Sequence, residues 1–122
     1  MTDSVRAAKP RTAKIPLDQL DLPVSFDPSG AMVTLREVLD GKPALPLAAL
    51  DPEQRTALVL ERLERQPGLE LAMVGAGFID RSRALLEVKA GTEAGRALSE
   101  IEEGVVQGLL DEVGADARRI HA

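Results

Sequence analysis

Thr92–Val113 reads TEAGRALSEIEEGVVQGLLDEV and is the longest stretch of the chain with a single clear period. Its apolar side chains recur in steps of three and four, which is the spacing of one face of an α-helix. They are Ala94, Ala97, Leu98, Ile101, Val105, Leu109 and Val113, with Val106 and Leu110 widening the face. Thr92 suits an N-cap, and Gly114 stands where a helix commonly ends. The stretch therefore predicts a long C-terminal helix over 93–113 that buries this apolar face.

Acidic side chains fill other positions of the same helix. They are Glu100, Glu102, Glu103, Asp111 and Glu112. A di-metal site in a helical bundle needs inward carboxylates with a histidine partner, and the chain's one histidine is His121, beside the C-terminus. We interpret the carboxylates as a solvated acidic face, and we predict neither a metal site nor a cofactor.

Two glycines inside the predicted helix need an explanation. Gly104 and Gly108 each cost about 1 kcal/mol relative to alanine in a helix interior. They share a ridge with Ala97 and Ile101, beside Val105, and small residues there would let another backbone approach closely. The neighbour could be the helix predicted over 52–65 of the same subunit, or the same helix of a second chain. These five residues are our candidate interface.

Capping signals define two helices nearer the N-terminus. Thr34 with Glu37, and Asp51 with Gln54, match the capping box, in which each side chain satisfies the other residue's backbone N–H. Pro52 suits the first helical position because its missing N–H costs nothing there. Helices are therefore predicted over 34–39 and 52–65.

The remaining segments predict a small sheet and one ambiguous element. Residues 24–26 and 69–74 have the composition of strands, and we expect them in one sheet. For 79–90 two interpretations compete: Asp80 as N-cap favours a helix over 81–90, although alternating Leu86 and Val88 could belong to the return strand of a hairpin. The predicted fold is α+β: a mostly helical single domain over 15–114 with a small sheet and a long C-terminal helix, between flexible tails over 1–14 and 115–122.

Composition excludes several classes of function. The chain has 122 residues, no cysteine, tryptophan or tyrosine, and two phenylalanines. Cysteine-ligated metals, thiol nucleophiles and aromatic stacking platforms are therefore absent. With no long apolar run and no leader-like N-terminus, we expect a cytoplasmic protein with no membrane contact.

Charge is distributed unevenly along the chain. Residues 1–14 carry Arg6, Lys9, Arg11 and Lys14 against Asp3, so of the net −5 this segment contributes +3 and the rest −8. An acidic body repels nucleic acid, which makes a nucleic-acid partner unlikely. A solvated basic tail is the simpler interpretation of the segment, and an arm that touches DNA is the alternative.

A glycine loop is the candidate ligand site. Gly75 and Gly77 follow a predicted strand, and Arg81 and Arg83 come soon after, so an anion or nucleotide could bind there. Asp80 stands where the dinucleotide fingerprint needs its third glycine, and its carboxylate would repel a pyrophosphate. Two glycines in a tight turn are the simpler interpretation.

Three functional hypotheses follow. The scarcity of catalytic residue types and the glycine groove favour a non-catalytic protein-interaction module, such as an adaptor, assembly factor or regulatory subunit, that self-associates through the C-terminal helix. The alternatives are a small anion- or nucleotide-binding domain, conceivably an enzyme, at Gly75–Gly77 with Arg81 and Arg83, and a DNA-associated regulator that uses the basic arm.

Overall fold

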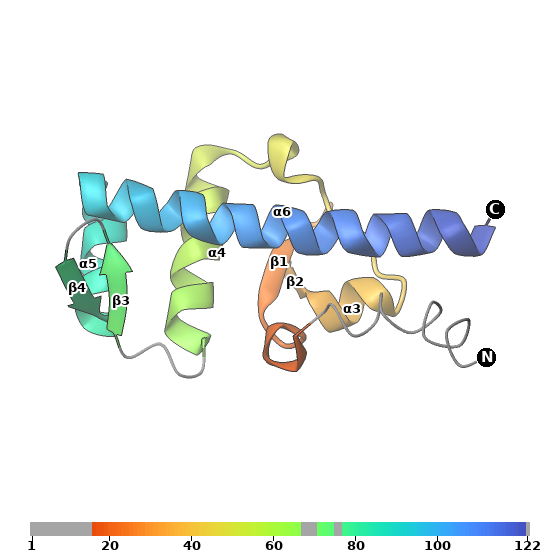
Figure 1. The fold of residues 1–122 in the computed structure, drawn as a ribbon. Coiled ribbons are helices and arrows are strands. Elements are labelled where there is room, and N and C mark those ends of the chain that lie inside the picture. The colour runs from red at the N-terminus through yellow and green to blue at the C-terminus, as the bar shows by residue number, and fades with distance from the viewer. Residues whose placement is uncertain (1–15, 67–70, 75–76, 122) are drawn as a thin grey trace, which may run out of the picture.

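A computed structural model describes residues 16–66, 71–74 and 77–121, with the backbone alone at 71–74, 77–78 and 115–121. The chain is α+β and mostly helical, as predicted (Figure 1). In order, its elements are η1 (Leu17–Gln19), β1 (Pro23–Phe26), β2 (Met32–Thr34), α3 (Leu35–Leu39), η2 (Leu47–Ala49), α4 (Pro52–Arg65), β3 (Leu71–Val74), β4 (Gly77–Asp80), α5 (Arg81–Ala90) and α6 (Glu93–His121).

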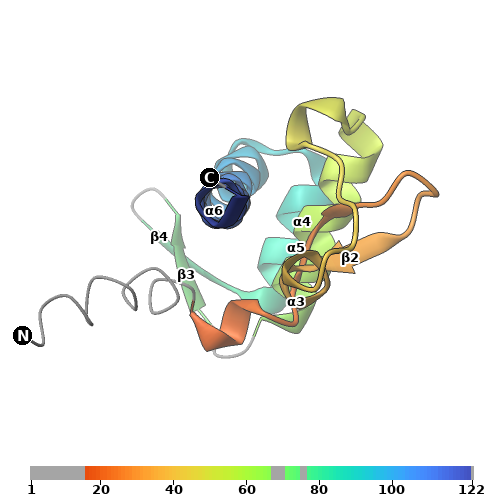
Figure 2. The same ribbon diagram turned by 90° about the vertical axis from the view of Figure 1, so that its right-hand side faces the viewer.

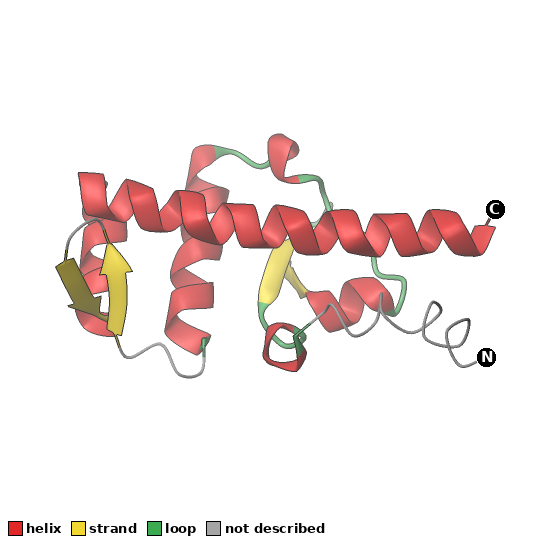
Figure 3. Cartoon of the chain, viewed as in Figure 1, coloured by secondary structure: helices red, strands yellow, loops and turns green. Residues whose placement is uncertain are grey.

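Helix α6 extends along the molecule, and the other elements are arranged beside it. Figure 1 shows α4, α5 and the paired strands β3 and β4 toward its N-terminal end, with β1, β2 and α3 further along, and Figure 2 looks along α6 from its C-terminal end. A tight corner joins α5 to α6, where Gly91 ends α5 with a positive φ of 67°, and Figures 1 and 2 show α6 crossing the direction of α5. Figure 3 shows how little of the chain is strand.

The strands form two separate sheets, so the expectation of one sheet from 24–26 and 69–74 is wrong. β1 pairs with β2, and β3 pairs with β4, both antiparallel. Each strand pairs with the next strand along the chain, and between β1 and β2 a turn reverses the chain, where Gly30 takes a positive φ of 96°. Local pairing has a lower loop-closure cost than a sheet between distant segments.

Helix starts follow the predicted capping. Thr34 and Glu37, and Asp51 and Gln54, form complete capping boxes at α3 and α4. Asp80 caps α5 by accepting from the Arg83 N–H at 2.8 Å. The favoured helix is therefore confirmed over 81–90, and a return strand also exists, but at 77–80, ahead of the helix.

Helix α6 begins as predicted and ends later than predicted. The Thr92 hydroxyl accepts the Gly95 N–H at 3.1 Å, which satisfies one of the free donors of the first turn. The helix continues past Gly114 to His121, so the expected stop is wrong. Residues 115–121 contain no proline, and one interior glycine costs only about 1 kcal/mol.

Two apolar clusters form the core, and α6 contributes to both. Val106 and Leu109 pack in the first, and Leu98 packs in the second. The buried face of α6 is rotated from the predicted one, because Ile101 and Val105 are 54% and 41% exposed. A broad apolar pattern around the helix left that rotation undetermined, and contacts with α5, α4 and α3 determine it.

Candidate functional site

A buried polar cluster connects α6 with three other elements. Arg62 of α4 has no solvent exposure. Its guanidinium donates from Nε to Glu102 Oε1 at 2.9 Å, from Nη1 to the Pro23 carbonyl at 3.0 Å and from Nη2 to Gln19 Oε1 at 2.6 Å. The cluster therefore joins η1, β1, α4 and α6 through one side chain.

Glu102 corrects the interpretation of the α6 carboxylates as a solvated face. It is buried and forms an ion pair with Arg62. Sequence reasoning missed both partners, although a signal was present: Arg62 lies four residues after buried Leu58, and Glu102 lies four after buried Leu98. A charge at a core position of a helix predicts a charged partner.

The geometry of this cluster indicates a structural role. Each nitrogen of the guanidinium has a protein acceptor, and burial keeps solutes away from Arg62. A group that binds substrate needs a path to solvent, and Arg62 has none. We therefore assign Arg62 and Glu102 to the alignment of α4, α6 and the N-terminal segment.

The outer face of α6, which we define as Ala97, Ile101, Gly104, Val105 and Gly108, is the predicted interface. Within the described part of the chain, no atom outside α6 comes within 4 Å of a β-carbon built at Gly104 or Gly108. The alternative in which α4 of the same subunit fills the groove is therefore wrong. Helix α4 contacts α6 on its opposite side, through Glu102.

Gly95 is the glycine that a close approach within the chain requires. A β-carbon added there would overlap the backbone carbonyl of Glu87 in α5. Packing within the subunit therefore explains Gly95 and leaves Gly104 and Gly108 unexplained.

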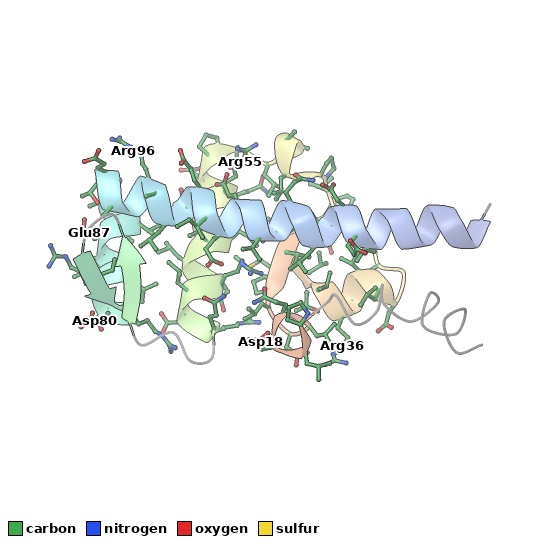
Figure 4. The ribbon with its side chains drawn as sticks, in the orientation of Figure 1. Asp18, Arg36, Arg55, Asp80, Glu87 and Arg96 are labelled. Carbon is green, nitrogen blue, oxygen red and sulfur yellow. The ribbon has the colours of Figure 1, made fainter. Side chains whose placement is uncertain are left out.

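The predicted anion site is occupied by contacts within the chain. Arg81 donates from Nη2 to the Gln66 carbonyl at 2.6 Å, and Arg83 pairs with Glu87 at 2.5 Å. The Asp80 carboxylate caps the helix N-terminus that an anion would need. Figure 4 shows Asp80, the last residue of β4, where α5 begins, and Glu87 further along α5. Gly75 lies outside the described residues, and Gly77 begins β4. These contacts do not favour an anion or nucleotide.

Other surfaces offer little chemistry. A shallow depression of about 350 Å³ lies on the first turns of α4, lined by Pro52, Glu53, Thr56, Ala57 and Leu60. Across the described residues, histidine and carboxylate side chains form no cluster of three that could hold a metal ion. The helices in that part of the chain are all too short or too polar to cross a membrane.

Comparison with known proteins identifies no relative: no family model, curated protein or solved structure matches this chain.

Proposed function

We propose that this chain is a non-catalytic protein-interaction module that self-associates through the outer face of α6. The proposal follows from the surface of the folded chain, because neither the buried cluster nor the depression on α4 offers a reactive group.

The observation that carries the proposal is the contrast among the glycines of α6. Gly95 is required by the carbonyl of Glu87, whereas no described residue outside α6 comes within 4 Å of a β-carbon built at Gly104 or Gly108. Each helical glycine costs about 1 kcal/mol relative to alanine. A second backbone packed against the outer face would explain both glycines, as in other close-packed helix pairs.

Exposed apolar side chains support the same conclusion. Ile101 is 54% exposed and Val105 is 41% exposed, and both flank Gly104. Burying them against another chain would stabilise a complex by roughly 25 cal/mol per Å² of apolar surface removed from water. A pair of such helices gives a small and reversible interface, which suits a regulatory or adaptor role.

Sedimentation equilibrium over a wide concentration range tests the proposal. We expect the wild-type chain to associate as concentration rises. Gly104→Leu should reduce the association constant at least about tenfold, a loss of roughly 1.4 kcal/mol, because the leucine side chain keeps the second backbone away.

Gln107→Leu is the matched control, since it adds a leucine to an exposed position of α6 outside the outer face. It should leave association unchanged, and circular dichroism should show native helix in both variants. A wild-type chain that stays monomeric throughout, or equal behaviour of the two variants, would contradict the proposal.

A further inference from the structure

The outer face of α6 lies between a charged edge and an apolar edge. At about 100° per residue, several exposed charged residues project to one side of Gly104. They form the charged edge: Glu93, Arg96, Glu100 and Asp111. Ile101 and Val105, which are also exposed, project to the other side and form the apolar edge. A helix that covers Gly104 therefore meets both edges.

Arg96 and Asp111 carry charges that the chain itself leaves uncompensated. Among the described residues, neither side chain belongs to an ion pair. Asp111 accepts a hydrogen bond from the neutral amide of Gln107 at 2.9 Å. Figure 4 shows Arg96 near the start of α6, pointing away from α5. Both charges are available to a partner chain.

An antiparallel pair of α6 helices satisfies both edges at once. A two-fold axis through Gly104, perpendicular to the helices, brings the two charged edges together on one side and the two apolar edges together on the other. Arg96 lies about 12 Å before Gly104 along the helix and Asp111 about 10.5 Å after it, so each Arg96 comes level with Asp111 of the partner subunit. Ile101 and Val105, about 4.5 Å before and 1.5 Å after, meet across the axis in the same way.

A parallel pair brings unlike edges together. Its two-fold axis runs along the helices, so the charged edge of each helix faces the apolar edge of the other. Arg96 then finds no carboxylate of the second helix at its own level, and its charge is placed against apolar surface at a cost in desolvation. Charge complementarity therefore favours the antiparallel pair.

We propose that two copies of this chain associate with their α6 helices antiparallel about Gly104, each Arg96 paired with Asp111 of the partner subunit. The proposal rests on the proposed function, whose surface it uses. It adds the orientation of the second copy and the two reciprocal ion pairs that select this orientation.

Charge reversal in the full-length chain tests the ion pairs by sedimentation equilibrium in about 0.05 M salt, where the Debye length exceeds about 10 Å. Arg96→Glu and Asp111→Arg should each reduce the association constant about tenfold, because two attractive contacts per dimer become repulsive. Arg96→Glu/Asp111→Arg exchanges the two charges and should restore the wild-type constant to within about twofold.

The net charge of the variants provides a control. Arg96→Glu lowers the net charge of −5 by two and Asp111→Arg raises it by two. General repulsion between acidic chains would weaken association in the first variant and strengthen it in the second, whereas the proposed pairs weaken both. Glu64→Arg makes the same change in charge as Asp111→Arg at an exposed position of α4, and it should not reduce the association constant.

Spin labels measure the orientation directly. The chain has no cysteine, so Glu93→Cys provides a single attachment point, eleven residues before Gly104. The two labels should lie roughly 33 Å apart in the antiparallel pair and about 10 Å apart in a parallel pair. Pulsed electron paramagnetic resonance distinguishes these separations.

Any of four results would overturn the proposed pairing while the wild-type chain still associates: unchanged constants in both single variants, opposite effects of the two variants, no recovery in the double variant, or labels near 10 Å. In those cases Gly104→Leu still tests the proposed function by itself. A wild-type chain that stays monomeric would overturn both.

Discussion

At the scale of the residue, two arginines of α4 show how burial determines the contribution of an ion pair to stability. Arg62 and Glu102 are paired at 2.9 Å with 0% and 9% of their side chains exposed. Three residues along the same helix, Arg65 and Glu61 are paired at 2.7 Å with 48% and 37% exposed. Water screens the second pair and cannot replace either partner of the first.

Removal of one buried partner should therefore be costly. We expect Arg62→Met to lower the free energy of unfolding by about 3–5 kcal/mol, because it leaves Glu102 as an uncompensated charge. The same change at Arg65 should cost at most about 1 kcal/mol. Urea unfolding measures both values, provided that the free energy of unfolding depends on urea concentration with the same slope in each variant.

The double variant Arg62→Met/Glu102→Leu distinguishes loss of the pair from loss of packing. It should be more stable than Arg62→Met alone, because no buried charge is left without a partner. Equal costs at Arg62 and Arg65, or additive costs in the double variant, would show that the buried pair is not coupled as described.

At the scale of the element, α6 has two different faces. One packs on α5 so closely that a β-carbon added at Gly95 would overlap the backbone of Glu87 and Val88, while among the described residues nothing outside α6 lies near Gly104 or Gly108. Glycine thus allows close packing within the subunit at Gly95, whereas at Gly104 and Gly108 it meets no described neighbour outside α6.

Alanine substitution should change the free energy of unfolding in opposite directions at Gly95 and at Gly104. Gly95→Ala should destabilise the fold by about 1–3 kcal/mol, because rigid backbone must move to admit the β-carbon. Gly104→Ala should stabilise the monomer by about 0.5–1 kcal/mol through higher helix propensity. Thermal or urea unfolding at a concentration that keeps the chain monomeric measures both, and the same sign at the two positions would contradict the packing of α5 on α6.

At the scale of the whole molecule, hydrogen bonds to carboxylates link stability to pH. The Thr92 hydroxyl, and then Arg83, hold the pKa of Glu87 below its ordinary 4.5. Arg36 likewise lowers the pKa of Asp21. The Ser29 hydroxyl lowers the pKa of Asp27, and the Thr34 N–H lowers that of Glu37.

Each lowered pKa gives stability that is present above the unfolded-state value and disappears as pH falls through the folded-state value. We therefore expect the free energy of unfolding to decrease as pH falls below about 4.5. The net charge passes through zero near pH 4.9, so general repulsion does not account for a loss that begins there. Urea midpoints between about pH 7 and pH 3 measure the trend.

Thr92→Val provides the local test, because it removes the largest cause of the Glu87 shift. The pKa of Glu87, followed by carboxyl NMR, should rise toward its ordinary value, and Thr92→Ser should retain the shift. An unchanged pKa in Thr92→Val would contradict the bond between Thr92 and Glu87.

The sequence by itself determined the local structure. The capping pairs Thr34–Glu37 and Asp51–Gln54, the Asp80 N-cap and the period of 92–113 predict four helices, because each signal acts within about one turn. Tertiary packing decided which face of α6 is buried, that Glu102 meets Arg62, and that Gly104 stays open while Gly95 does not. These features depend on residues about 40 positions apart, as for Arg62 and Glu102, and no local pattern encodes how two such helices rotate against each other.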